Sequence, residues 1–390
     1  MPHTGILESF FYIFAGAAVL ATLALYTRQP LLVAFIALGC LLGPFGGGLV
    51  ADASLLNEIS EVGIIFLLFL VGLDLQPGKL KNMLGESIWT ALVTTAVFFG
   101  IGFGVVWAFG FTLTEAIVSG LAASFSSTLL GIKLLPTTAL HHRHIGEIVI
   151  SLLLIQDLLA ILAIIALNGI GLDQAALLTS LLAIFIGLPL LSLLAYLAVR
   201  YVLLRLISAF DAFHEYIFLI AIGWCLGVTS AAGALGLSYE IGAFIAGVTL
   251  ATSPIAQYIA ENLRPLRDFF LVLFFFSVGA GLNLPLLADN WLPVIVLAGL
   301  LIACKPIVFA YLLKFQGEDT EVAWEVGYRL GQASEFSLLL SYIAISSQLI
   351  GDNAALTIQF ATVLTLVVSS YFVIFRYPSP IAPDARLRRN

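Results

Sequence analysis

The chain has 390 residues, of which 61% are hydrophobic and only 10% are charged, and its mean hydropathy is +1.10. Soluble domains are about 45–50% apolar and about 25% charged, so this composition excludes a soluble enzyme and a nucleic-acid binder. Apolar runs of about 20 residues recur along the chain, and each can cross a hydrocarbon core about 30 Å thick. The sequence therefore predicts an all-α polytopic membrane protein that is surrounded by lipid and has no nucleic-acid partner.

Polar, charged and Gly/Pro-rich breaks divide the chain into thirteen expected spans. They are residues 6–26, 30–50, 58–75, 87–109, 113–135, 144–168, 174–206, 213–235, 239–256, 268–286, 291–313, 322–347 and 354–376. No basic region precedes the first apolar run, so we expect residues 6–26 to be a retained span and not a signal peptide.

The basic residues predict how the chain is oriented in the membrane. With the N-terminus outside, the inward-facing segments hold all Lys and Arg residues except Lys305 and Arg329, which lie within spans. The outward-facing loops carry aspartates instead. The positive-inside rule therefore predicts an external N-terminus and a short cytoplasmic tail at residues 377–390.

The sequence also repeats itself at a nearly constant offset. The stretch AFIA occurs at 34–37 and again at 243–246, and Ser127 corresponds to Ser334. Seven spans separate equivalent elements, and an odd separation inverts the second copy, as in many secondary transporters. We therefore expect one transmembrane domain over 1–376, with repeats at about 6–168 and 213–376 and a linker helix at 174–206.

The functional candidates include four ionisable side chains within the predicted spans. An ionisable group at mid-membrane is costly, so each one is a functional candidate. Asp157 is centred in the sixth span beside Gln156, in SLLLIQDLLAILAII. We expect Lys305 to form an ion pair with Asp157 that takes part in a switch, because a buried pair is a poor stabiliser. Glu335 is expected to pair with Arg329 or with a half-helix dipole.

Small polar residues interrupt the fifth span at 124–128 and the twelfth at 331–335. Ser and Thr often bond back to their own helical turn, and that alternative stays open. Their matching places in the two repeats favour two broken helices that cross near the midplane, with freed carbonyls and hydroxyls that coordinate a monovalent cation. The expected cation and proton ligands are Asp157, Gln156, Ser126, Ser127 and Thr128. The expected charge-compensating residues are Lys305, Glu335 and Arg329.

Several motifs occur in an order that is typical of one transporter family. They are FLLFLVGLDLQPGKL at 66–80, Gln156-Asp157, LGLSYEIGAFIAGVTLATS at 235–253, LFFFSVGAGLNL at 273–284, Lys305, and RLGQASEFSLLL at 329–340. In these motifs the chain resembles the cation:proton antiporter-2 family, and within it the Kef-type potassium/proton antiporters. The resemblance implies an inverted-repeat antiporter fold with crossed, unwound fifth and twelfth helices.

The resemblance also implies a homodimer in a bacterial inner membrane. Kef proteins usually continue into a cytoplasmic domain that binds nucleotide and glutathione. Only residues 377–390 follow the last predicted span here, so either a regulatory domain or subunit lies outside this chain or this member of the family lacks one.

The residues and the resemblance together predict electroneutral exchange of K⁺ for H⁺ by alternating access at Asp157, with no cofactor besides the transported ions. Sodium/proton members of the family typically carry Asp-Asp where this chain has Gln156-Asp157, and a neutral carbonyl gives a weaker field that suits K⁺. Na⁺/H⁺ exchange, a ligand-gated K⁺ efflux channel and an organic-anion symporter stay open as alternatives. The sequence shows no nucleophile–base pair or metal-ligand spacing of the kind that an enzyme needs.

Overall fold

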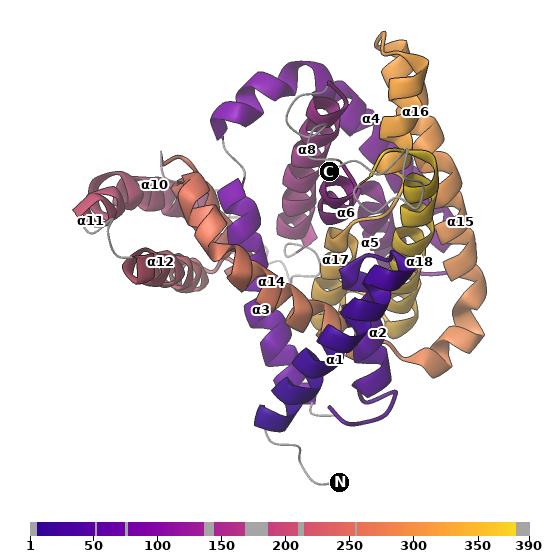
Figure 1. The fold of residues 1–390 in the computed structure, drawn as a ribbon, viewed down its shortest axis with the longest axis horizontal. Coiled ribbons are helices and arrows are strands. Elements are labelled where there is room, and N and C mark those ends of the chain that lie inside the picture. The colour runs from indigo at the N-terminus through magenta and orange to yellow at the C-terminus, as the bar shows by residue number, and fades with distance from the viewer. Residues whose placement is uncertain are drawn as a thin grey trace. The chain divides into compact units, whose positions relative to one another are not determined.

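The computed structural model describes residues 6–50, 53–74, 77–135, 144–167, 186–209, 214–253 and 256–379. The predicted linker helix at 174–206 is therefore described only from residue 186, and the predicted tail only as far as residue 379. Helices make up the regular elements of the described residues, as predicted (Figure 1).

Each of the thirteen predicted spans corresponds to a helix or a run of helices among the described residues. The uninterrupted helices are α1 (Ile6–Thr27), α2 (Leu31–Leu42), α3 (Ala53–Asp74), α4 (Pro77–Ala108), α8 (His144–Leu167), α12 (His214–Ala234), α13 (Tyr239–Ala251), α14 (Ala256–Ala280) and α18 (Asp352–Arg376). Helix α15 (Leu284–Phe315) is kinked at Asn290, whose backbone angles are not helical. The interrupted ones are α5 (Leu113–Ser124) with α6 (Thr128–Lys133), α10 (Leu188–Ala198) with η2 (Val199–Leu203) and α11 (Leu204–Ala209), and α16 (Thr320–Arg329) with α17 (Glu335–Ser346). Within the described part, seven helices are long and apolar enough to cross a membrane.

Several helix ends differ from the predicted span ends. Helix α14 begins at Ala256 and not at residue 268, because the polar stretch AQYIAENLRPLR is helical although it has no membrane-like hydropathy. Helix α2 ends at Leu42 and not at residue 50. The backbone turns at the following glycines, where Gly48 adopts a positive φ of 65° that suits a residue without a side chain.

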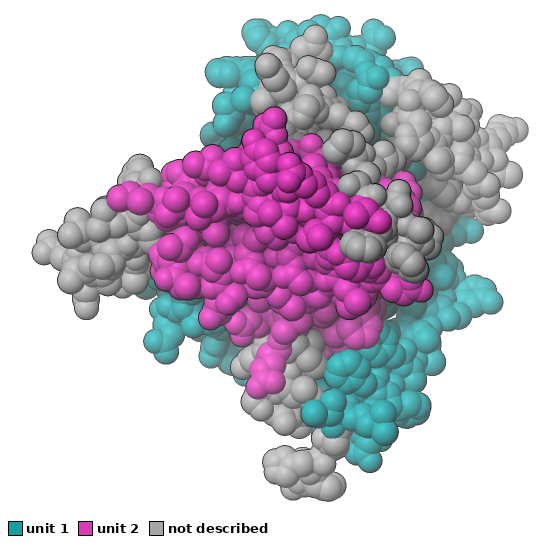
Figure 2. All heavy atoms as spheres, turned by 90° about the vertical axis from the view of Figure 1, so that its left-hand side faces the viewer, with its two compact units in different colours: residues 1–51, 83–167, 278–390 teal, residues 52–82, 168–277 magenta. Residues whose placement is uncertain are grey.

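The helices form two compact units, which Figure 2 colours separately. Unit 1 consists of residues 1–51, 83–167 and 278–390, and unit 2 consists of residues 52–82 and 168–277. Every candidate site residue lies in unit 1.

Helix α15 organises the packing inside unit 1, where α16 and α18 both lie beside it (Figure 1). Phe309 of α15 is fully buried and contacts the ring of Phe98 on α4, with ring centroids 5.5 Å apart. In unit 2, α3 and α13 approach so closely that a Cβ on Gly247 would overlap the Phe69 carbonyl oxygen. Small residues permit such close helix contacts in membrane proteins.

The helix bounds recur at a nearly constant interval. Helix α15, at 284–315, is as long as α4, at 77–108. Helix α16 begins at 320 and α5 at 113, while α17 begins at 335 and α6 at 128. Both pairs are separated by the same interval as α15 and α4. Helices α12, α13 and α18 begin at 214, 239 and 352 and follow α1, α2 and α8, which begin at 6, 31 and 144, at an interval only one residue longer. A duplicated unit would produce this regularity, and on it we base the proposal of two repeats.

Both predicted helix breaks are confirmed. Residues 125–127 separate α5 from α6, and residues 330–334 separate α16 from α17. Phe125 follows the last residue of α5, and Ser334 precedes the first residue of α17. Both have an extended backbone, with ψ of 155°. The two breaks meet, because the Ser126 hydroxyl donates to the Leu330 carbonyl at 2.8 Å. Each break leaves backbone carbonyls and N–H groups without helical partners in the interior of unit 1.

Candidate ion-binding site

Asp157 is a buried carboxylate beside the first helix break. It lies on α8 with 5% of its surface exposed, and the Thr128 hydroxyl is 2.9 and 3.0 Å from its two carboxylate oxygens. Thr128 is the first residue of α6, so the carboxylate faces the positive end of that short helix. A buried carboxylate needs compensation by a proton, a cation or hydrogen bonds. Asp157 and Thr128 together therefore provide oxygens that can hold a proton or a small cation.

Gln156 holds the first break in place. Its side chain is fully buried, and its carbonyl oxygen accepts the Ser126 N–H at 3.1 Å. The amide nitrogen has no hydrogen-bond partner among the described residues. This geometry differs from our expectation that Gln156 presents its carbonyl oxygen to the cation. The backbone N–H freed by the break requires an acceptor, so that oxygen is already engaged.

The two serines of the break also hold the backbone. The Ser126 hydroxyl donates to Leu330, and the Ser127 hydroxyl accepts the Leu130 N–H at 3.1 Å. Ser127 is thus the N-terminal cap of α6. Of the five predicted ligands, Thr128 and Asp157 are in direct contact, while Ser126, Ser127 and Gln156 stabilise the crossing of the two broken helices.

Lys305 is fully buried and binds both breaks. Its ammonium donates to the Phe125 carbonyl at 2.5 Å, to the Gln332 carbonyl at 3.1 Å and to the Ser126 hydroxyl at 3.4 Å. It also lies 4.9 Å from the ring centroid of Phe98. An ammonium has three donors, and these three acceptors use them all.

The predicted Lys305–Asp157 ion pair is therefore wrong for this conformation. The Phe125 carbonyl caps the C-terminal end of α5, and the Gln332 carbonyl lies inside the second break, three residues after α16 ends. Lys305 therefore contacts the backbone of both breaks, and its predicted charge-compensating role stays a prediction.

Arg329 joins three segments of unit 1. Its Nε and Nη2 donate to Glu325 Oε1 at 3.0 and 2.6 Å, its Nη1 donates to the Leu134 carbonyl at 2.9 Å, and its Nη2 donates to the Pro378 carbonyl at 2.8 Å. The carboxylate paired with Arg329 is therefore Glu325 and not Glu335. Glu335 is the first residue of α17, so its position fits the other predicted alternative, interaction with a half-helix dipole.

Sequence reasoning missed two residues of α18, Thr365 and Ser369, that contact the second break. The Gln332 side chain donates to the Arg329 carbonyl at 2.9 Å and accepts from the Ser369 hydroxyl at 3.1 Å. The Thr365 hydroxyl oxygen accepts the Ala333 N–H at 2.9 Å. Thr365 and Ser369 stand four residues apart on α18 and so share one helix face, a spacing that could have drawn attention to them.

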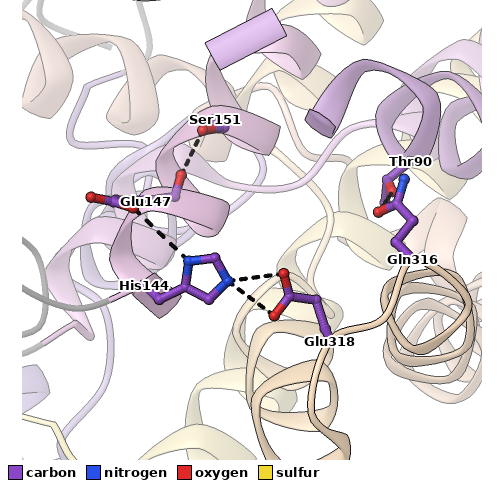
Figure 3. A network of polar contacts seen from close by, with 6 residues as sticks. All are labelled: Thr90, His144, Glu147, Ser151, Gln316 and Glu318. Atoms are coloured by element: carbon purple, nitrogen blue, oxygen red, sulfur yellow. Dashed lines mark hydrogen bonds and ion pairs between the residues drawn. The ribbon is translucent and has the colours of Figure 1, made fainter. Parts of the chain in front are cut away.

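A second polar network lies away from the breaks. His144, at the start of α8, pairs with Glu318 at 2.9 Å, and the Thr90 hydroxyl of α4 donates to the Gln316 side chain at 2.7 Å (Figure 3). Both Gln316 and Glu318 follow the end of α15. The His144 side chain is 59% exposed, and exposed ion pairs contribute little to stability. Among the described residues there is no group of three or more His, Cys, Asp or Glu that could hold a metal ion. The first break remains the candidate site.

Comparison with known proteins agrees with this architecture. The family model described as "Sodium/hydrogen exchanger, transmembrane" matches residues 10–375. The chain is 29% identical over 373 residues to "Putative cation/proton antiporter YbaL" of Escherichia coli (strain K12), which covers 91% of this chain and 67% of that protein. It is 30% identical over 351 residues to "K(+) efflux antiporter 4" of Arabidopsis thaliana, which covers 87% of this chain and 59% of that protein.

The fold also matches a solved structure. The sodium proton antiporter MjNhaP1 from Methanocaldococcus jannaschii at pH 8 superposes with a TM-score of 0.66 at 15% identity, over 98% of both chains. This match confirms the predicted fold class, a polytopic helical membrane protein with the antiporter fold. Since the family model spans nearly the whole sequence, the chain belongs to the sodium/hydrogen exchanger family of integral membrane proteins, and it is a cation antiporter and not an enzyme.

Proposed function

We propose that this chain exchanges one K⁺ for one H⁺ by alternating access, with Asp157 as the group that binds either ion. The observation that carries this proposal is the buried Asp157 carboxylate in contact with the Thr128 hydroxyl at the first helix break. The proposal of K⁺ rests on Gln156, which stands where a second carboxylate would raise the charge of the site. It is also supported by the names of relatives such as K(+) efflux antiporter 4.

The proposed exchange follows from competition for the same carboxylate oxygens. When Asp157 is protonated it is neutral, and when it is ionised it attracts one monovalent cation, which restores neutrality. Thr128 can donate to the ionised carboxylate, or turn an oxygen lone pair toward a cation. The site carries the same net charge with either ion bound. When it changes from facing one side of the membrane to facing the other, no net charge is therefore moved. Exchange at such a site is electroneutral.

Lys305 has a fixed role in this proposal. Its three donors are occupied by the breaks, so it does not alternate with a proton or cation on Asp157. Glu335 likewise compensates the positive end of α17 and does not titrate during transport. One proton is then released for each cation bound.

Na⁺/H⁺ exchange is the second candidate function. The solved structure with the matching fold is that of a sodium proton antiporter, although at 15% identity the likeness concerns the fold alone. Selectivity between K⁺ and Na⁺ depends on the number and field strength of the oxygens around the ion. A ligand-gated K⁺ channel on the same scaffold would carry the cation without any proton flux.

The deciding experiment is proton flux in proteoliposomes to which K⁺, Na⁺, Rb⁺ or Li⁺ is added in turn. We expect K⁺ to drive proton movement in the wild type and Asp157→Asn to abolish it, because asparagine keeps the side-chain volume but cannot hold an exchangeable proton. Asp352→Asn, at the exposed start of α18, is the matched control and should exchange like the wild type. Na⁺-driven flux alone would favour the second candidate, and cation flux without proton flux would favour the channel. Normal exchange by Asp157→Asn would refute the site.

We further propose a homodimer in the bacterial inner membrane, with the N-terminus outside and the C-terminus in the cytoplasm. The one-sided distribution of Lys and Arg in the sequence supports the orientation. The chain spans 67% and 59% of the two relatives named above, so regulation through a further domain or subunit stays a proposal. Native mass spectrometry and labelling of single cysteines from each side of the membrane would test the assembly and the orientation.

A further inference from the structure

The two helix breaks contain one peptide group each that is held in the same way. In the first break, the Phe125 carbonyl accepts from Lys305, and the N–H of the same peptide group, on Ser126, donates to Gln156. The second break repeats this arrangement at the interval that separates α16 from α5: the Gln332 carbonyl accepts from Lys305, and the N–H of Ala333 donates to Thr365.

Thr365 is thus the structural counterpart of Gln156. Both residues are buried, and both lie on the sixth and last span of their proposed repeat, α8 for Gln156 and α18 for Thr365. The interval between them differs by a single residue from the interval between the starts of α8 and α18. Gln156 accepts with an amide oxygen and Thr365 with a hydroxyl oxygen. The backbone N–H groups that they accept occupy equivalent positions in the two breaks.

The orientation of the Thr365 hydroxyl follows from its second contact. It donates its single proton to the Thr362 carbonyl of its own helix at 2.8 Å. Its oxygen lone pairs are therefore left to accept the Ala333 N–H. A threonine that only bonds back to its own turn has no such second contact. Thr357 on the same helix is of that kind, since its hydroxyl donates to the Asn353 carbonyl at 2.8 Å.

We infer that Thr365 is a positioning residue for ion exchange, which sets the place of Lys305 through the peptide group between Gln332 and Ala333. The peptide group is planar, so fixing its N–H also fixes the direction of its carbonyl. A hydrogen bond at the N–H additionally polarises the carbonyl and strengthens the bond from Lys305. Ser369 assists by donating to the side chain of Gln332. This inference rests on the proposed function, in which Lys305 must stay away from Asp157.

The test compares Thr365→Val with Thr365→Ser and with the matched control Thr357→Val in the proteoliposome assay. Without the Thr365 oxygen, the carbonyl loses its fixed direction, and the loosened ammonium competes with the transported cation for oxygens. We expect Thr365→Val to raise the half-saturating K⁺ concentration by about tenfold and to displace the pH profile. Thr365→Ser keeps the hydroxyl, so its half-saturating K⁺ concentration should stay within about twofold of the wild type and its pH profile should match the wild type. Thr357→Val should match the wild type in both.

A Thr365→Val variant with wild-type half-saturation and pH profile would overturn the inference, even if its maximal rate were lower. If that variant does not fold, Ser369→Ala replaces it and should shift half-saturation in the same direction, with no shift counting against the inference. Melting of Thr365→Val, Lys305→Met and the double variant reports the coupling independently of transport, and strictly additive changes would contradict it. The same assay with Asp157→Asn tests the proposed function separately, since normal exchange there refutes the site but leaves this coupling intact.

Discussion

Replacing Lys305 by methionine removes a buried ammonium and leaves a side chain of similar length without donors. The carbonyls of Phe125 and Gln332 then lose the charged donor that each of them binds. An unsatisfied buried carbonyl costs about 1–3 kcal/mol, so the two together cost about 2–6 kcal/mol. Removal of the buried charge offsets part of this, and we expect a net loss of about 2–4 kcal/mol in the free energy of unfolding.

The assay is thermal unfolding of purified protein, with Lys314→Met as control. Lys314 lies on the same helix but is exposed near its end, so its replacement should leave the melting temperature unchanged. A double variant with Asp157→Asn separates the two explanations for any loss. If Lys305 were paired with Asp157, neutralising the carboxylate would recover much of the stability. Anchoring by the breaks predicts no such recovery, and a double variant more stable than Lys305→Met would refute the reasoning.

Three further predictions concern other residues around the breaks. Gln156→Leu leaves the Ser126 N–H without its acceptor and should lower the free energy of unfolding by about 1–3 kcal/mol, measured by thermal melting; an unchanged melting temperature would show that the bond is unimportant. Arg329→Lys keeps the charge but loses the planar guanidinium that reaches three acceptors. Its melting temperature should therefore be lower than that of Glu325→Gln, and the reverse order would contradict the role of the guanidinium. Glu335→Gln should still exchange ions without moving charge, and loss of proton-coupled flux would show that this carboxylate titrates.

Much of the fold could be predicted from residue patterns because a membrane makes those patterns strong. An apolar stretch in lipid must satisfy its own backbone, so hydropathy alone located all the helices that the structure describes. The helix breaks could be predicted because small polar residues stood at matching places in the two proposed repeats. The ends of α14 and α2 could not, because polar residues continue a helix into water and glycines can end one inside an apolar run.

The contacts in the site were harder to predict for a physical reason. Opposite charges in spans suggested the pairs Lys305–Asp157 and Arg329–Glu335, and neither is present among the described contacts. The sequence does not show which backbone carbonyls of the two breaks lie close together. In this fold the carbonyls of Phe125 and Gln332 do, and Lys305 donates to both. Thr365 gave no signal by itself, because a buried threonine in a membrane helix usually bonds back to its own turn.

The central claim is that one carboxylate, Asp157, binds either one proton or one cation. The most direct test is the half-saturating K⁺ concentration of the wild type in proteoliposomes, measured across a range of pH. Competition with one proton predicts that, on the acidic side, this concentration rises about tenfold for each unit that the pH falls, and that it levels off once Asp157 is ionised. A rise of about a hundredfold per unit would require two protons for each cation, and it would contradict the one-carboxylate account.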